Sequence, residues 1–114
     1  MVAPTAGAVV LVPFPFSALS RSKLRPAVVL ADAGHRDWIL CQVTSNPYSD
    51  PRAIPLSDED FDVGSLRRDS YARPGKLFTA NRSLLVAQVG VLKEETFRRI
   101  ITAVVSLLQT KPAE

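Results

Sequence analysis

Arg25 and Thr44 are the two residues whose types and spacing best suit chemistry on a phosphate group. They stand at the outer ends of two apolar runs, residues 25–31 and 38–44, and a turn-rich segment separates the runs. This pattern predicts a β-hairpin whose open end carries both side chains. A planar, permanently charged guanidinium matches the oxygens of a phosphate, and a hydroxyl beside it adds a further hydrogen bond.

The register of this hairpin follows from a symmetric turn. With Ala31 opposite Trp38, Arg25 lies opposite Thr44, and directly paired residues share a face with Cβ atoms about 4.5–5.5 Å apart. A one-residue slip would scatter the apolar residues that this register gathers on the other face. These residues are Val28, Leu30, Ile39, Cys41 and Val43.

The rest of the chain predicts a mainly β fold with a C-terminal helix. A first strand over residues 8–16 contains Pro13 and Pro15, which cannot donate to a ladder and indicate an edge position or a bend. Short strands with one late helix indicate a compact, barrel-like sheet. The other expected elements are strands at 53–56, 70–79 and 84–92, a helical turn at 57–61 with Ser57 as N-cap, a loop over 63–70 and an amphipathic helix over 94–109.

Length and composition bound the class of protein. At 114 residues the chain is expected to be one domain, residues 1–114 with a core over about 7–109. Cys41 is the only cysteine, so an internal disulfide or a zinc finger is excluded and a reducing cytoplasm is favoured. The N-terminus lacks the basic region of a secretory signal. The apolar stretch 103–108 is far shorter than the ~20 residues of a membrane helix, so we expect a soluble protein.

Charge permits a nucleic-acid partner without demonstrating one. Fourteen Lys and Arg residues against eleven Asp and Glu residues give a net charge of +3. Taken alone, the charge clusters fit ordinary solvated loops. The basic clusters are Arg21, Lys23 and Arg25, and later Arg67, Arg68, Arg73 and Lys76; the acidic residues Asp58, Glu59, Asp60 and Asp62 lie between them.

The order of several motifs resembles the PemK/MazF-like toxins of bacterial toxin–antitoxin modules. The motifs are GAVVLVPFPF at 7–16, RPAVVL at 25–30, QVTS at 42–45 and RPGKL at 73–77, and the similarity extends from Gly7 to Leu108. Those toxins are small RNA-cleaving ribonucleases. The resemblance therefore implies an SH3-like barrel and an endoribonuclease that cuts single-stranded RNA.

The resemblance also implies roles for individual residues. Arg25 and Thr44 match catalytic positions, Ser45 is adjacent, and Arg73 matches a position that contacts RNA or assists the chemistry. Some relatives carry an acidic residue two positions after that arginine; here the place is Gly75, which puts an Arg–carboxylate mechanism in doubt. Further candidates for RNA binding are Arg21, Lys23 and Lys76 at phosphates, and Asn46, Phe16 and Tyr71 at bases. A buried Phe16 and a merely turn-forming Asn46 are open alternatives to these contacts.

Cleavage of RNA through its 2′-OH requires a proton acceptor, a proton donor and fixed donors for the charge on phosphorus. Arg25 meets the third requirement, but an arginine is a poor general base. His35 is the only histidine, and histidine is the side chain that most often transfers protons near neutral pH. It lies in the hairpin turn, about 20 Å from Arg25 at ~3.3 Å per residue, which excludes it. We expect no cofactor and no metal ion, because the chain offers no convincing cluster of metal ligands.

Two kinds of protein partner follow from the resemblance. Family members are homodimers whose interface forms RNA-binding grooves, and the extended tail of a cognate antitoxin occupies these grooves. The second face of the hairpin supports some burial, since an exposed monomer surface rarely keeps so apolar a pattern. Its residues are Ala27, Val29, Trp38 and Leu40.

Two alternatives to the ribonuclease stay open at this point. The CcdB-like toxins, of the same barrel class, bind DNA gyrase and cleave nothing; growth arrest with intact RNA would indicate such a protein. An SH3-like RNA-binding module would bind an oligonucleotide tightly and release no product. Arg25 together with Thr44 favours the enzyme.

Overall fold

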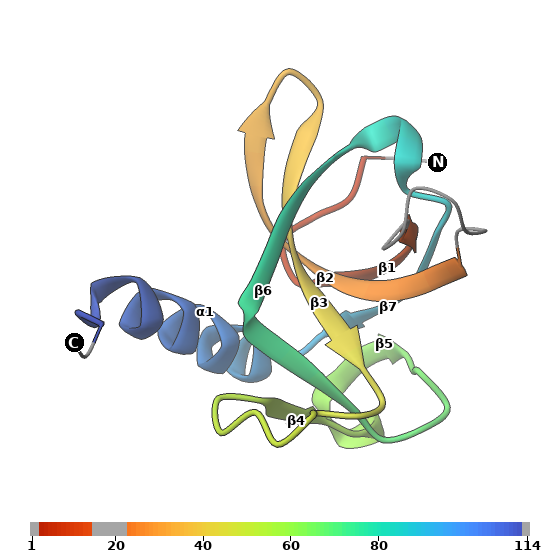
Figure 1. Ribbon diagram of the computed structural model, residues 1–114. Helices are drawn as coiled ribbons and strands as arrows, with labels where there is room; N and C mark the ends of the chain where they lie inside the picture. The colour runs from red at the N-terminus through yellow and green to blue at the C-terminus, as the bar shows by residue number, and fades with distance from the viewer. Residues whose placement is uncertain (1–2, 15–22, 113–114) are drawn as a thin grey trace.

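One antiparallel sheet of seven strands, followed by a helix, makes up the described part of the chain, residues 3–14 and 23–112, in this computed structural model (Figure 1). The sheet curls into a half-barrel with the strand order β4-β6-β3-β2-β1-β7-β5. This confirms the predicted mainly β fold with a C-terminal helix. The elements are β1 (Ala8–Phe14), β2 (Lys23–Gly34), β3 (Asp37–Thr44), β4 (Ile54–Leu56), β5 (Phe61–Gly64), β6 (Ser70–Asn81), β7 (Ala87–Leu92), α1 (Glu94–Gln109) and short 3₁₀ helices at Asp58–Asp60 and Arg82–Leu84.

Strands β2 and β3 form the predicted hairpin, with the predicted register toward its open end. The ladder pairs Val28 with Cys41 and Val29 with Leu40. Val28 and Cys41 are fully buried in a core that also contains Ile100 of α1. The apolar pattern therefore identified the buried face correctly.

The register near the turn differs from the prediction. Ala31 pairs with Ile39 rather than with Trp38, because a β-bulge shifts the ladder. The turn itself is a tight one of two residues, His35 and Arg36, both with positive φ (54° and 65°). Such a closure suits the twist of a hairpin but leaves no room for the six-residue turn assumed from the sequence.

The second face of the hairpin is also buried, and the chain itself covers it. Ala27, Val29 and Leu40 have no exposed surface and pack in a second core with Val10 and the partly buried Trp38. The buried members of this core come from β1, β2, β3 and β6 and from Leu85, which follows the second 3₁₀ helix, so other parts of the chain cover this face. The apolar pattern of this face therefore needs no second copy of the chain to explain it.

Pro13 does not mark the first strand as an edge strand of the sheet. Strand β1 lies between β2 and β7. The ladder with β7 runs only from Ala8 to Leu11, however, so Pro13 lies beyond it and has β2 on one side alone. A residue without an N–H group is tolerated there because no ladder partner requires one. Pro15 lies outside the described residues.

Strand β5 was missed from the sequence, which predicted a loop from residue 63 onward. It pairs with β7, and Gly64 lies opposite Gly90. A Cβ atom on Gly64 would come within 2.1 Å of the Val89 carbonyl oxygen, and its φ of +75° suits glycine. In the sequence, the available sign of this strand was the pair of glycines, because only glycine allows the two backbones to approach so closely. The helical turn beside it, with Ser57 as N-cap, is as predicted.

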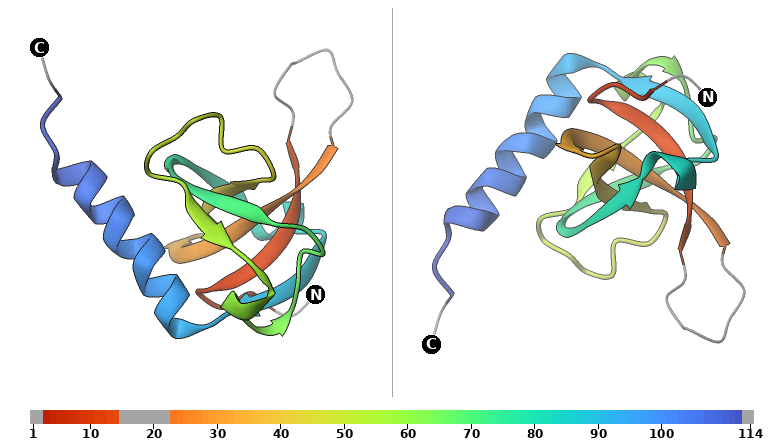
Figure 2. Two further views of the ribbon diagram at one scale, coloured as in Figure 1. Left: turned by 90° about the horizontal axis from the view of Figure 1, so that it is seen from below. Right: turned by 90° about the horizontal axis from the view of Figure 1, so that it is seen from above.

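Helix α1 has the predicted bounds, residue for residue. Ile100 and Val104 of its apolar stripe are buried against the sheet. The later members Val105 and Leu108 are 44% and 71% exposed. They are exposed because the C-terminal turns of the helix run past the sheet, as both views in Figure 2 show.

Candidate active site

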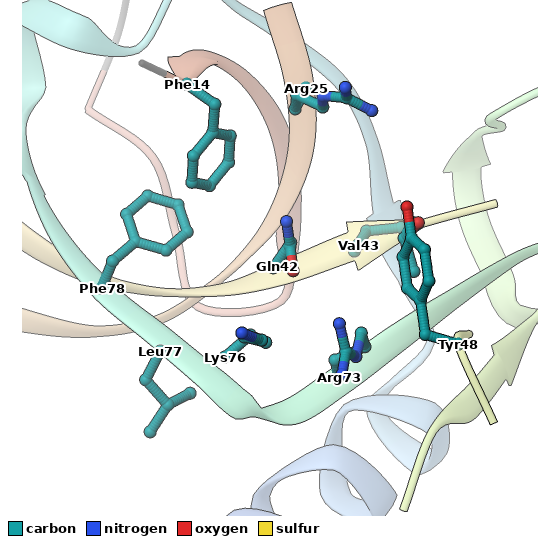
Figure 3. Close-up of a pocket in the computed structure, with 10 residues that line it drawn as sticks. Phe14, Arg25, Gln42, Val43, Tyr48, Arg73, Lys76, Leu77 and Phe78 are labelled. Carbon is teal, nitrogen blue, oxygen red and sulfur yellow. The ribbon is translucent and has the colours of Figure 1, made fainter. Parts of the chain in front are cut away.

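Three neighbouring strands bring polar side chains from distant parts of the sequence to one pocket of about 440 Å³, the site pocket (Figure 3). Arg25 comes from β2, Thr44 from β3, and Arg73 and Lys76 from β6. Because β3 lies between the other two strands, the two arginines stand on opposite sides of it, about 10 Å apart at the usual strand spacing. The remaining lining residues are Phe14, Gln42, Val43, Tyr48, Leu77 and Phe78.

Arg25 and Thr44 lie just beyond the last pair of the β2–β3 ladder. That pair is Ala27 with Gln42, so each of the two site residues is two positions further along its own strand. A step of two residues keeps the side chain on the same face of a sheet. Both residues are half-buried. The sequence prediction that this hairpin end gathers a guanidinium and a hydroxyl thus agrees with the pocket.

Arg73 and Lys76 line the same pocket although they are three residues apart. In a regular strand they would point to opposite faces. The ladder between β3 and β6 is irregular here, since Val43 pairs with Ala72 and Cys41 pairs with Leu77. Strand β6 bends sharply at this place (Figure 1). The bend lies at residues 73–76, and its Pro-Gly step is the sequence signal for it.

The guanidinium of Arg73 is held on two sides by one loop. Its Nε donates to Oδ2 of Asp50 at 3.1 Å, and the two side chains are only 17% and 14% exposed. Its Cζ lies 5.4 Å from the centre of the Tyr48 ring, which is a cation–π contact. The N–H of Arg52 donates to Asp50 and the Arg73 guanidinium lies beside it, so the pKa of this carboxyl is below its ordinary value. Asp50 is therefore a carboxylate at neutral pH.

The backbone of Arg73 is fixed as well. The Sγ of Cys41 donates to the Arg73 carbonyl oxygen at 3.2 Å. Burial raises the pKa of the Cys41 thiol to about 12, against a smaller opposing effect of this hydrogen bond. The sulfur is thus a neutral donor at physiological pH rather than a thiolate nucleophile.

Thr44 and Asn46 begin the loop that holds Arg73. The Oγ1 of Thr44 accepts from the N–H of Asn46 at 3.1 Å, and Oδ1 of Asn46 accepts from the N–H of Tyr48 at 2.9 Å. Asn46 is exposed and does not line the site pocket. Its side-chain oxygen accepts within the turn, which is the turn-forming role that the sequence left open, and a contact of Asn46 with RNA stays a prediction.

The other predicted contacts are more scattered. Lys23 is exposed at the start of β2 and lines neither the site pocket nor the smaller cavity beside it. Tyr71 pairs with Thr44 along the sheet without lining the site pocket. Arg21 and Phe16 lie outside the described residues. His35 is exposed in the hairpin turn, as predicted, and is absent from the lining of the site pocket.

A second, smaller cavity of about 280 Å³, the side pocket, shares Arg25, Val43 and Thr44 with the site pocket. It adds Ser45 and the exposed Arg68. Arg25 and Thr44 therefore stand where two hollows meet. An extended ligand passing from one to the other would place its middle at these two residues.

Sequence reasoning missed several residues of the site pocket. Gln42 shares a face with Thr44 and interrupts an apolar strand, which was an available signal. Phe14 and Phe78 stack edge to face with ring centres 4.5 Å apart and form the apolar end of the pocket. Only the fold shows that these two rings meet, since 64 positions separate them.

Neither a metal-ligand cluster nor a membrane-spanning helix is present in the described part of the chain. Among residues 3–14 and 23–112, no group of three or more His, Cys, Asp or Glu side chains is arranged to hold a metal ion. Within the same residues no helix has the length and apolar character needed to cross a membrane.

Comparison with known proteins identifies the family. Residues 5–108 match the family described as PemK-like, MazF-like toxin of type II toxin-antitoxin system. Among curated proteins no match was found. The matched residues span nearly the whole chain and include every residue that lines the site pocket.

Solved structures share the fold at low sequence identity. A MazE-MazF complex (Form-II) from Deinococcus radiodurans has a TM-score of 0.76 at 21% identity, covering 97% of this chain and 100% of the other. MazF (Form-I) from the same organism has a TM-score of 0.75 at 22% identity, covering 96% of this chain and 100% of the other. An endoribonuclease in complex with its cognate antitoxin from Mycobacterial species has a TM-score of 0.72 at 16% identity, covering 99% of this chain and 100% of the other. With the fold and the sequence in agreement, the chain belongs to the PemK-like, MazF-like toxins of type II toxin–antitoxin systems.

Proposed function

We propose that this chain is a toxin that cleaves single-stranded RNA at the site pocket and is held inactive by a cognate antitoxin. The observation that carries the proposal is the arrangement of Arg25, Thr44 and Arg73 on three adjacent strands around one hollow. Two arginines on opposite sides of the hollow suit a single phosphate between them. The family match does not favour the gyrase-binding alternative.

The proposed reaction is an internal transfer that needs no metal ion. The 2′-oxygen of the nucleotide on the 5′ side of the cut forms a bond to phosphorus while the bond to the 5′-oxygen breaks. The 2′-OH loses its proton, and the departing 5′-oxygen gains one. The products are a 2′,3′-cyclic phosphate and a 5′-OH.

The residues of the site pocket supply charge and orientation for this step. Arg25 and Arg73 stabilise the extra negative charge on the phosphoryl oxygens. Thr44 Oγ1 accepts a hydrogen bond from Asn46, so its hydrogen can point to a phosphoryl oxygen. Lys76 adds positive charge at the rim, and the Phe14–Phe78 pair offers aromatic surface to an unpaired base.

The solved relatives support a protein partner. Two of them are complexes of a toxin with its antitoxin. We propose that a cognate antitoxin covers the site pocket and the side pocket of this chain in the cytoplasm, and that the toxin acts as a homodimer. Sedimentation equilibrium of the purified protein would measure whether it is a homodimer.

Purified protein incubated with a mixed-sequence RNA transcript tests the proposed function. We expect cleavage at discrete sites, equal rates with and without excess EDTA, and a loss of at least about 100-fold in Arg25→Ala, since one donor to developing charge is worth that much. Arg98→Ala is the matched control, because Arg98 is an exposed helix residue paired with Glu94. Intact RNA with the parent protein, or equal cleavage by Arg25→Ala, would refute the proposal.

A further inference from the structure

The geometry points to Asp50 as the residue that positions Arg73 for contact with the phosphate, a role that rests on the proposed function. Asp50 belongs to the loop between β3 and β4, far in sequence from the Arg-Pro-Gly-Lys segment. It supplies from another element the carboxylate that is missing two positions after Arg73. Asp50 itself acts through Arg73 and does not line the site pocket.

The contact between the two side chains is specific in its atoms. Asp50 uses Oδ2 for the Nε of Arg73 at 3.1 Å and Oδ1 for the N–H of Arg52 at 2.9 Å. A bond at Nε fixes the plane of the guanidinium through its inner nitrogen. The two terminal nitrogens lie at the far end of this plane and remain for a ligand of the site pocket, which Arg73 lines between Lys76 and Tyr48 (Figure 3).

The loop that carries Asp50 is itself tightly held. The N–H of Asp50 donates to the Pro47 carbonyl at 2.9 Å, and the Asp50 carbonyl accepts from Ala53 at 3.1 Å. Tyr48 and Ser49 both adopt positive φ, 53° and 58°, a conformation that costs non-glycine residues energy. Backbone strain at two successive residues is tolerated where other contacts fix the loop. This conformation delivers Tyr48 and Asp50 to Arg73 together.

The position of Gly75 explains why the carboxylate must come from elsewhere. A Cβ atom built on Gly75 would lie 3.5 Å from Cδ2 of Leu107 on α1 and would meet no other atom within 4 Å. Gly75 does not line the site pocket, whereas Arg73 does. In this bent strand a side chain at 75 would begin its course toward the helix. The Arg–carboxylate pair that the sequence placed in doubt is therefore present, but with Asp50 as its acidic member.

The substitution Asp50→Asn tests this role with little change of shape. Asparagine keeps one oxygen for the N–H of Arg52 and replaces the oxygen at Arg73 with an NH₂ group, which cannot accept. Asp58→Asn is the matched control, since it removes one carboxylate from an exposed 3₁₀ residue. Arg73→Ala and the double variant Asp50→Asn/Arg73→Ala complete a double-mutant cycle.

Two measurements on these four variants and the parent separate the inference from the proposed function. The first is kcat/KM for a labelled RNA oligonucleotide. The second is the affinity for the same oligonucleotide with 2′-deoxy residues throughout, which binds without being cut by the proposed reaction. Thermal unfolding confirms that each variant is folded.

We expect Asp50→Asn to lower kcat/KM by about 10- to 100-fold, as a misplaced contact does, and to weaken binding severalfold. Both effects should vanish in the Arg73→Ala background, which a merely structural role of Asp50 would not produce. Cleavage and binding unchanged by Asp50→Asn, or losses that persist without Arg73, overturn the inference. Binding that depends on Asp50 without any cleavage by the parent supports the inference and refutes the proposed function. A parent that neither binds this oligonucleotide nor cleaves RNA overturns both.

Discussion

At the scale of one residue, a hydrogen bond orients the hydroxyl group of Thr44. Its oxygen accepts from the N–H of Asn46, and this leaves the hydroxyl hydrogen for a second partner. The same bond anchors the loop that carries Tyr48 and Asp50. Thr44 thus lines the site pocket and also holds the loop that contacts Arg73.

We expect Thr44→Ser to keep its activity within a few-fold and Thr44→Val to lose about 10²- to 10³-fold in kcat, because only serine preserves the hydroxyl that donates to the phosphoryl oxygen. Initial rates on a labelled oligonucleotide measure this, with thermal unfolding of both variants as the control. A valine variant as active as the parent would show that the hydroxyl has no part in the reaction.

At the scale of elements, Asp60 of the acidic run after β4 connects two parts of the fold. Asp60 accepts from the N–H of Ser57 at 2.8 Å, from the hydroxyl of Thr96 at 2.8 Å and from Arg99 at 2.9 Å. It therefore ties the turn before β5 to the first turns of α1. Burial alone would raise the pKa of Asp60, but the hydrogen bonds from Ser57 and Thr96 and the charge of Arg99 outweigh it and lower the pKa.

We expect Asp60→Asn to lose about 1–3 kcal/mol of stability at pH 7, the usual cost of removing a charged hydrogen-bond acceptor. Because the pKa of Asp60 is lowered on folding, its contribution is present above about pH 4 and is lost as the pH falls through the lowered value. Urea unfolding should therefore show a large gap between parent and variant at pH 7 and a smaller one at pH 3. Asp58→Asn, at an exposed position, should have the same stability as the parent at both pH values. Equal stability of the parent and Asp60→Asn at pH 7 would contradict the assignment.

Elements with a regular period could be predicted from the sequence, and those shaped by irregular pairing could not. Helix α1 repeats its apolar residues every three or four positions, so its bounds were right. The open end of the hairpin was right because Val28 and Cys41 must share the core. The bulge near Ala31 and the bend at residues 73–76 depend on strands that lie elsewhere in the sequence.

The candidate site divides in the same way. Arg25, Thr44, Arg73 and Lys76 were found because short motifs carry them. Asp50 was not found, because its partner Arg73 is 23 positions away and no motif joins the two. A loop that closes over a distant strand leaves no periodic pattern in the sequence.

At the scale of the whole molecule, the two joined pockets are lined by four basic residues and, among the described residues, by no Asp or Glu. Arg68 lies in the side pocket, Arg25 where the pockets meet, and Arg73 and Lys76 in the site pocket. An extended acidic segment presents negative charge along its length as RNA does. The two ligands should therefore compete for one surface.

We expect a small acidic antitoxin to inhibit cleavage with an on-rate that falls as salt rises, because complementary charge steers the encounter. Arg73→Glu should weaken this inhibitor, and Arg98→Glu, at an exposed helix position, should not. Stopped-flow binding at two ionic strengths measures the rates. An antitoxin indifferent both to salt and to Arg73→Glu would remove the electrostatic part of the account.

The chemistry at the cut is tested most directly with one altered atom in the substrate. An RNA oligonucleotide carrying a single 2′-deoxy nucleotide on the 5′ side of the mapped cut lacks the attacking oxygen and nothing else. We predict that this substrate resists the parent protein and that the upstream product of the all-ribose substrate carries a 2′,3′-cyclic phosphate, read by mass spectrometry. Cleavage of the deoxy substrate at the ribose rate would contradict the proposed reaction.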